Sequence, residues 1–265
     1  MRPKIGLALG AGGAKGFAHI GVLKVLEEEN IPVDYIAGSS MGAAIGAVYS
    51  AGTDLDLLEK LAREVKNHHI LDIGLPKLGL IKGKKALALS RLLTHNKSFD
   101  ELNIPLKVVA TDLITGERVV FSEGKVADAV RASISVPGAI EPYSLDARTF
   151  VDGAVTDRVP AQVVQEMGAD IVLAVDLQYF NCGIVATIHN VYDVIMQSIE
   201  IMERAHRNYY CEYADIIIKP NVCEHSWTDF EEASTIIEAG KEACREILPQ
   251  LRRLIDSYSI EIGER

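Results

Sequence analysis

One stretch near the start of the chain decides the fold: residues 5–28 read IGLALGAGGAKGFAHIGVLKVLEE. The apolar run Ile5–Leu9 is typical of a buried strand, and the glycines from Gly10 to Gly13 break it. A helix is predicted from about Ala14 to Glu28, because apolar residues then recur with helical spacing. A strand, a glycine-rich turn and a helix in this order indicate a parallel sheet covered by helices.

The rest of the chain continues to alternate short Val- and Ile-rich runs with longer helical patterns. Strands are predicted at 34–37, 106–110, 119–121, 150–151, 171–175 and 215–219, and helices at 41–51, 54–66, 126–134, 186–211 and 230–258, with one more opened by Pro160. We therefore expect an α/β fold of three layers, with a mostly parallel central sheet flanked by helices.

Composition excludes several classes of protein. The chain has 265 residues, of which 48% are hydrophobic and 24% charged, and its net charge is −10. This is a globular composition, neither disordered nor fibrous. The acidic balance argues against nucleic acid as a partner, since a duplex-binding protein needs a basic face. At this length we expect one large domain, or one domain with an extension.

The cysteines and the N-terminus bear on location. Cys182, Cys211, Cys223 and Cys244 form no C-x-x-C pair and are predicted to be free thiols in a reducing compartment. The N-terminus leads straight into a strand without an apolar leader, and no uncharged run reaches the roughly 18 residues of a membrane span. A cytoplasmic location is expected, with peripheral contact at a membrane surface left open.

The glycine loop, Gly10-Ala11-Gly12-Gly13-Ala14-Lys15-Gly16, is the first motif with chemical meaning. Glycines between a strand and a helix allow a tight bend and expose N–H groups at a helix N-terminus, which suits an anion or oxyanion. A dinucleotide fingerprint fails because Lys15 stands at its third glycine, and no G-K-[ST] ending is present. The alternative is a simple tight turn.

Gly38-Ser39-Ser40-Met41-Gly42 is the second motif and matches G-x-S-x-G between a predicted strand and helix. The pattern places the central serine, Ser40, on a sharp turn, where the flanking glycines avoid collisions. A helix N-terminus also favours a developing alkoxide. The alternative role for Ser40 is a helix N-cap.

A nucleophilic serine needs a base, and two arrangements compete. A histidine base would come from His189, His206 or His225, but the first two are predicted on a helix and the third lies in a loop. The other candidate is Asp152, which follows a predicted strand at the edge where parallel sheets bind ligands. Partial burial would raise its proton affinity. Its alternative role is to accept N–H groups of a turn.

Taken together, the glycine loop, Gly38-x-Ser40-x-Gly42, Asp152-Gly153-Ala154 and the segment Arg131–Gly138 (RASISVPG) resemble the patatin-like phospholipase family, especially its small bacterial members. The resemblance covers roughly residues 5–165. It implies a patatin-like fold in which residues 5–165 form the catalytic domain and residues 166–265 a C-terminal strand and helical extension packed on it.

The resemblance also implies a serine–aspartate dyad, with Ser40 as nucleophile and Asp152 as base. The oxyanion donors would be backbone groups of Gly10, Gly12 and Gly13, and neither a metal nor another cofactor is expected. The chain departs from the family at Ala154, an accepted variant of a second glycine. It departs again at Asp157-Arg158, where many members carry asparagines, so substrate contacts there stay open.

The implied function is that of a serine hydrolase. Its substrates would be acyl esters of phospholipid, lysophospholipid or related lipids, cleaved through an acyl-enzyme. Two alternatives remain open from the sequence. One is an acyltransferase using the same dyad, and the other is a non-catalytic regulatory protein that retains the fold.

The stretch 68–99 differs from the rest of the chain, because it is glycine-broken, apolar and rich in lysine. We expect it to lie outside the core and to cover a site. One interpretation is peripheral contact with anionic lipid, at about 1 kcal/mol per nearby lysine. A packed lid and a dimer contact are equally consistent with the pattern, so the oligomeric state stays open.

Overall fold

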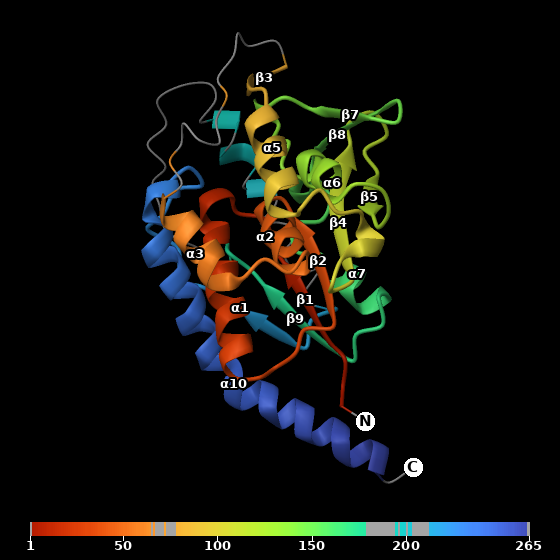
Figure 1. Ribbon diagram of the computed structural model, residues 1–265, viewed down its shortest axis with the longest axis vertical. Coiled ribbons are helices and arrows are strands. Elements are labelled where there is room, and N and C mark those ends of the chain that lie inside the picture. Colours follow the sequence, from red (N-terminus) through yellow and green to blue (C-terminus); the bar gives the residue numbers. More distant parts are fainter. Residues whose placement is uncertain are drawn as a thin grey trace.

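The structure is a computed structural model that describes residues 2–64, 66, 72, 78–178, 194–195, 197–199, 201–202 and 212–263 (Figure 1). Its strands are β1 (Ile5–Leu9), β2 (Tyr35–Ser39), β3 (Gly79–Ile81), β4 (Leu106–Asp112), β5 (Arg118–Phe121), β6 (Gly138–Ile140), β7 (Tyr143–Leu145), β8 (Arg148–Asp152), β9 (Ile171–Val175) and β10 (Ile216–Ile218). Its helices are α1 (Ala18–Glu28), α2 (Met41–Ser50), α3 (Leu55–Glu64), α5 (Lys84–Leu93), α6 (Val126–Ser133), α7 (Ala161–Glu166) and α10 (Ala233–Gly263). Short 3-10 turns are η1 (Gly13–Phe17), η2 (Phe99–Glu101), η3 (Gly153–Val155) and η4 (Phe230–Glu232).

The main sheet has the strand order β10-β9-β1-β2-β4-β8-β7, and β5 also pairs with β4. The five strands from β10 to β4 are parallel, whereas β5, β7 and β8 pair in antiparallel fashion. The prediction of a mostly parallel α/β sheet is therefore confirmed. The antiparallel strands extend it on the β4 side, where β8 delivers Asp152.

Side chains of the parallel strands alternate between two apolar cores. In β1, Leu7 and Leu9 point to the core formed with α1, α2, α3, α6 and α10, whereas Ala8 points to a smaller core formed with α7. This alternation follows from the period-2 geometry of a strand. Figure 1 shows α1, α3 and α10 side by side on one side of the sheet. The predicted three layers are confirmed.

Helix α1 packs directly on α10 because two glycines bring their backbones close. A Cβ on Gly21 would lie 2.0 Å from the carbonyl oxygen of Ile237, and a Cβ on Gly240 would lie 2.0 Å from that of Ala18. Each helix therefore needs a residue without a side chain at the crossing. The contact ties the C-terminal helix to the unit that contains the glycine loop.

The C-terminal part of the chain joins the same sheet. Strand β9 lies between β1 and β10, with Ile5 opposite Ile171 and Leu9 opposite Val175. Residues beyond 165 thus contribute two strands and α10 to the main core.

Several elements differ in detail from the predictions. The helix expected from Ala14 begins as the 3-10 turn η1, with Gly13 at a φ of 57°, and becomes α-helical only at Ala18. The predicted 230–258 helix divides into η4 and α10, which continues through Pro249 to Gly263. The predicted 186–211 helix lies mostly outside the described residues.

The stretch 68–99 was expected to lie outside the core, and this is wrong for Phe99, which is buried in the main core. Ile81 and Ala86 are also buried, because β3 pairs with β6 and α5 packs against α6, and both side chains line the pocket described below. The apolar residues of this stretch are spaced irregularly in the sequence, but β3 and α5 bring some of them to one buried side.

Two of the four cysteines lie in the described part of the chain, and they differ in oxidation state. Cys244 is a free thiol buried in α10, whereas Cys223 is disulfide-bonded, so the prediction of free thiols is wrong for Cys223. Burial raises the pKa of the Cys244 thiol to about 12. Within the described ranges, no helix combines the length and apolar character needed to cross a bilayer.

The α1–α10 crossing predicts a difference between two helical glycines. Gly240→Ala should lower the free energy of unfolding by about 2 kcal/mol, because the added methyl meets backbone. The matched control is Gly46→Ala in α2, where the new Cβ would lie 3.0 Å from Ile36 Cγ2, a side-chain atom that can shift. It should cost less than about 1 kcal/mol, since helix propensity offsets the contact. Urea unfolding measures both, and equal losses would contradict the account.

Candidate active site

Ser40 occupies the sharp turn between β2 and α2 that the sequence predicts. Its backbone has φ 54° and ψ −123°, a positive φ that is strained for a residue with a side chain. The flanking glycines are required by close backbone. A Cβ on Gly38 would lie 2.5 Å from the backbone nitrogen of Ala43, and one on Gly42 would lie 2.1 Å from the carbonyl oxygen of Leu9.

Strand β4 brings Asp152 to this turn. Ser39, the last residue of β2, is opposite Val109, and Asp152, the last residue of β8, is opposite the next β4 residue, Ala110. The two strands flank β4 on opposite sides, run in opposite directions and end opposite neighbouring β4 residues. The Ser40 hydroxyl donates a hydrogen bond to Oδ2 of Asp152 at 2.6 Å, and both side chains are buried.

The Asp152 carboxylate is fixed by further backbone contacts. Its Oδ1 accepts a hydrogen bond from the Ala154 N–H at 2.8 Å, which leaves Oδ2 for Ser40. Its own N–H donates to the carbonyl oxygen of Ser135 at 2.9 Å. A Cβ on Gly153 would lie 2.3 Å from the carbonyl oxygen of Val109, so glycine is required there. The predicted Asx-type turn at Asp152 and its contact with Ser40 therefore coexist.

Some N–H groups of the glycine loop donate hydrogen bonds within the protein, and others do not. The Gly10 N–H donates to the Val175 carbonyl at 3.1 Å, so it is not available to an oxyanion, and the prediction of Gly10 as a donor is corrected. The N–H groups of Ala11 and Ala14 are also engaged, by the carbonyls of Arg158 and Trp227. Among the described residues, the N–H groups of Gly12 and Gly13 have no hydrogen-bond acceptor.

Two residues that sequence reasoning did not single out, His19 and Arg158, donate hydrogen bonds to carbonyls of this loop. The buried His19 donates from Nε2 to the Gly10 carbonyl at 2.8 Å, and burial lowers its pKa to about 4, so the ring is neutral near neutral pH. Arg158 donates from Nη2 to the Ala11 carbonyl at 2.9 Å. Asp157, the residue before it, forms an ion pair with Arg118 at 2.8 Å. Both residues of the Asp157-Arg158 departure from the family pattern therefore have structural contacts.

No histidine contacts Ser40 among the described residues. His189 and His206 lie outside the described residues, and the hydrogen bonds of Ser40 go to Ser133 and Asp152, not to His225. Asp152 is therefore the acceptor that the structure places on the Ser40 hydroxyl.

Two serines of the RASISVPG segment also touch the site. The hydroxyl of Ser133, at the end of α6, accepts a hydrogen bond from the Ser40 N–H at 2.8 Å. The carbonyl of Ser135 accepts the N–H of Asp152. The sequence signal for this segment was the family resemblance alone, since its spacing gives no hint of these contacts.

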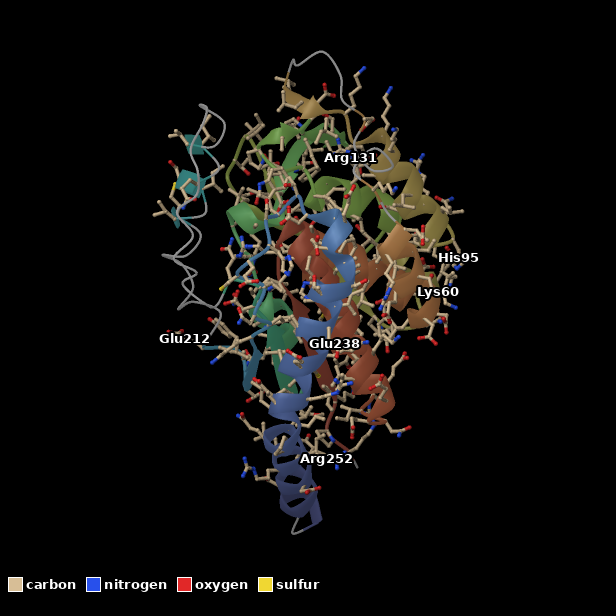
Figure 2. The ribbon with its side chains drawn as sticks, turned by 90° about the vertical axis from the view of Figure 1, so that its left-hand side faces the viewer. Lys60, His95, Arg131, Glu212, Glu238 and Arg252 are labelled. Carbon is tan, nitrogen blue, oxygen red and sulfur yellow. The ribbon has the colours of Figure 1, made fainter. Side chains whose placement is uncertain are left out.

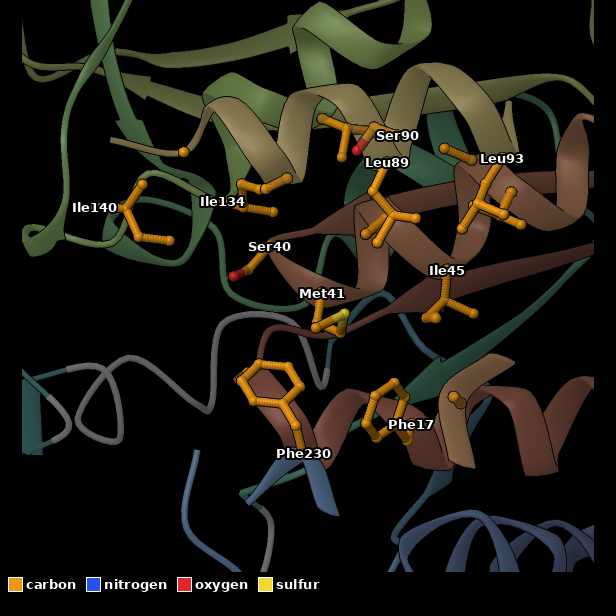
Figure 3. A pocket seen from close by; sticks show the side chains of 18 of the residues that line it. Phe17, Ser40, Met41, Ile45, Leu89, Ser90, Leu93, Ile134, Ile140 and Phe230 are labelled. Atoms are coloured by element: carbon orange, nitrogen blue, oxygen red, sulfur yellow. The ribbon is translucent and has the colours of Figure 1, made fainter. Parts of the chain in front are cut away.

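An apolar pocket of about 280 Å³ adjoins Ser40. Met41, Ile45 and Val48 line one wall from α2, and Leu89 and Leu93 line another from α5. Figure 3 shows the hydroxyl of Ser40 at this lining, with Met41 and Ile45 following along α2 and Phe17 and Phe230 below. Gly13 also lines the pocket, so the glycine loop, the serine and the apolar surface share one site.

Comparison with known proteins identifies the class. The profile of the family described as "Patatin-like phospholipase" matches residues 7–164, and the chain belongs to this family, which supports a lipid hydrolase activity. The fold is shared at low identity: the crystal structure of VipD from Legionella pneumophila is 14% identical with a TM-score of 0.51, covering 94% of this chain and 67% of that one. The type III effector protein ExoU gives a TM-score of 0.56 at 14% identity, covering 94% and 53%.

Closer relatives in sequence are longer proteins. The NTE family protein Rv1063c of Mycobacterium tuberculosis is 39% identical over 184 residues, which are 68% of this chain and 51% of that protein. Human patatin-like phospholipase domain-containing protein 6 is 33% identical over 181 residues, 65% of this chain and 13% of that protein. The chain thus spans about half the length of its mycobacterial relatives.

The strained turn predicts an unusual order of stability for two variants. Ser40→Ala and Ser40→Gly both remove the hydroxyl, but only glycine tolerates the φ of 54°. Strain relief of about 1–3 kcal/mol should exceed the flexibility cost of glycine, about 0.5–1 kcal/mol, so Ser40→Gly should be the more stable. Urea unfolding tests this. A Ser40→Ala protein equal to or more stable than Ser40→Gly would show that the turn is unstrained.

Proposed function

We propose that this chain is a serine hydrolase that cleaves the acyl ester of a phospholipid, lysophospholipid or related lipid through a covalent acyl-enzyme. One observation carries the proposal: the Ser40 hydroxyl lies 2.6 Å from a buried carboxylate, at the wall of an apolar pocket. Membership of the patatin-like phospholipase family supports the same class of substrate.

In the first half-reaction, Asp152 takes the proton of Ser40 while the serine oxygen attacks the ester carbonyl. Burial favours the protonated carboxyl that results, which improves an intrinsically weak base. The tetrahedral oxyanion is bound by the N–H groups of Gly12 and Gly13, the unengaged donors of the glycine loop. Each such donor contributes about 3 kcal/mol to lowering the barrier.

Asp152 then acts as an acid to complete the first half-reaction and as a base and acid again in the second. Its proton passes to the alcohol oxygen as the ester bond breaks, which leaves the acyl group on Ser40 and the carboxylate charged again. The carboxylate then takes a proton from water as the water attacks the acyl carbonyl, and this proton returns to Ser40 as the acid departs. One carboxylate therefore serves as base and acid in turn, without a histidine.

The apolar pocket fits the acyl chain of the substrate. Each methylene that leaves water contributes about 0.8 kcal/mol. The α2 wall from Met41 to Val48 is roughly 10 Å long at 1.5 Å per helical residue. An extended chain advances about 1.3 Å per carbon, given a C–C bond of about 1.52 Å. The pocket therefore accommodates about eight carbons.

The dyad is tested by hydrolysis of p-nitrophenyl esters of increasing acyl length. Ser40→Ala should lower kcat/KM by at least about a thousandfold, and Asp152→Asn by about a hundredfold or more, because the base is lost. The matched control is Ser39→Ala, next to the nucleophile, whose buried hydroxyl has no hydrogen-bond partner among the described residues. It should retain activity. Wild-type hydrolysis that survives in Ser40→Ala would disprove the assignment.

The outer surface near the pocket supports a second part of the proposal, peripheral contact with a membrane. Leu78 and Leu80 are 72% and 45% exposed, next to the exposed lysines Lys82 and Lys84. Apolar side chains flanked by cations suit the interface of a membrane with anionic headgroups. This surface belongs to the stretch 68–99, whose described residues also line the pocket, so contact there would bring lipid to the site.

Replacing both leucines tests this contact. The double variant Leu78→Ser, Leu80→Ser should lose about tenfold in activity on anionic phospholipid vesicles, because two apolar anchors no longer enter the interface. Its activity on a soluble short-chain ester should stay unchanged. The control is Leu57→Ser on α3, which is 50% exposed outside this stretch. Equal loss on both substrates would indicate a lid instead, and a changed oligomeric state would indicate a dimer contact.

A further inference from the structure

Arg131 is a buried cation that the proposed mechanism does not use. It lies near the end of α6, in the RASISVPG segment, and is only 3% exposed. Figure 2 shows it at the end of the molecule opposite Arg252 of α10. A buried guanidinium is costly unless its N–H groups find acceptors, so its contacts indicate what it holds together.

The guanidinium donates in two directions. Nη1 donates to the hydroxyl of Ser135 at 2.6 Å. Nη2 donates to the carbonyls of Lys82 and Glu141 at 2.8 and 2.9 Å. The group also lies over the ring of Tyr143, 5.2 Å from its centre. A planar fork with several donors can bridge such separated acceptors, whereas a single ammonium cannot.

One side of this bridge is the roof of the pocket, which we define as residues 78–93. Lys82 lies between β3 and α5, and Glu141 follows β6, the strand paired with β3. Ile81, Ala86 and Leu89 of the roof line the pocket. A Cβ on Gly83 would lie 2.4 Å from the guanidinium, so the roof backbone lies directly against Arg131.

The other side of the bridge is the dyad. Ser135, which accepts from Nη1, also accepts the Asp152 N–H at its carbonyl. Two residues earlier, the Ser133 hydroxyl accepts the Ser40 N–H. The short segment that carries Arg131 is therefore hydrogen-bonded to the backbone of both dyad residues.

We propose that Arg131 is a positioning residue that sets acyl-chain specificity by fastening the roof of the pocket to the segment that holds Ser40 and Asp152. It acts through Ser135 and the roof backbone and does not touch the substrate. The inference rests on the proposed function, because it assigns the pocket to an acyl chain. In addition, the contacts of this buried cation with the roof would determine how deep the pocket is for the acyl chain.

The test compares a decanoyl with an acetyl p-nitrophenyl ester. In Arg131→Met the KM for the decanoyl ester should rise about tenfold. This rise is equivalent to losing contact with about two methylenes. The KM for the acetyl ester and the kcat values for both esters should change little. Arg131→Lys should lie between this variant and the wild type. The control is Arg91→Ala, which breaks an exposed ion pair between α5 and α6 at 3.2 Å and should leave the ratio of the two KM values unchanged.

A second variant and a binding measurement test the same role of Arg131 without relying on the Arg131→Met enzyme alone. If Arg131→Met does not fold, Gly83→Ala displaces the guanidinium from the roof side and should raise the same KM ratio. Calorimetric binding of decanoate to Ser40→Ala, with and without the Arg131 change, needs no turnover, and the change should weaken it about tenfold. Weaker decanoate binding in a protein that hydrolyses no ester would refute the proposed function but support the inference. Equal loss on both esters, or no loss, with unchanged decanoate binding would overturn the inference.

Discussion

The hydrogen bond between Ser40 and Asp152 depends on where two strands end against β4. Strand β2 ends opposite Val109 and the antiparallel β8 ends opposite Ala110, so the last residues of both strands meet at consecutive positions. A shift of one residue in either strand would turn one side chain to the other face of the sheet. The register of β4 is therefore the constraint on which the rest of the site depends.

Close backbone packing explains why glycines surround the site. Gly38 and Gly42 lie against the backbone of Ala43 and Leu9, and Gly153 lies against the Val109 carbonyl. Ser40 itself adopts a positive φ, and the surrounding packing holds it there. The strained turn directs the hydroxyl to Asp152 and to the pocket, whose apolar walls come from α2 and α5.

The motifs could be read from the sequence because each one is local. A strand, a glycine turn and a helix, the G-x-S-x-G turn, and an aspartate before glycine each express chemistry within a few residues. What the sequence could not show depends on distant contacts. The Gly10 N–H is engaged by Val175, far along the chain, and this removes it from the predicted donors. Arg131 meets the Lys82 carbonyl 49 residues away, and no periodicity encodes that contact.

If Ser40 is a nucleophile activated by Asp152, a reagent that reacts covalently with activated serines should label it. The wild-type protein would be treated with an octyl fluorophosphonate and analysed by intact mass and peptide mapping. We expect a single adduct on Ser40 that forms about a hundredfold more slowly in Asp152→Asn. An adduct on another residue, no adduct, or an equal rate in Asp152→Asn would contradict it.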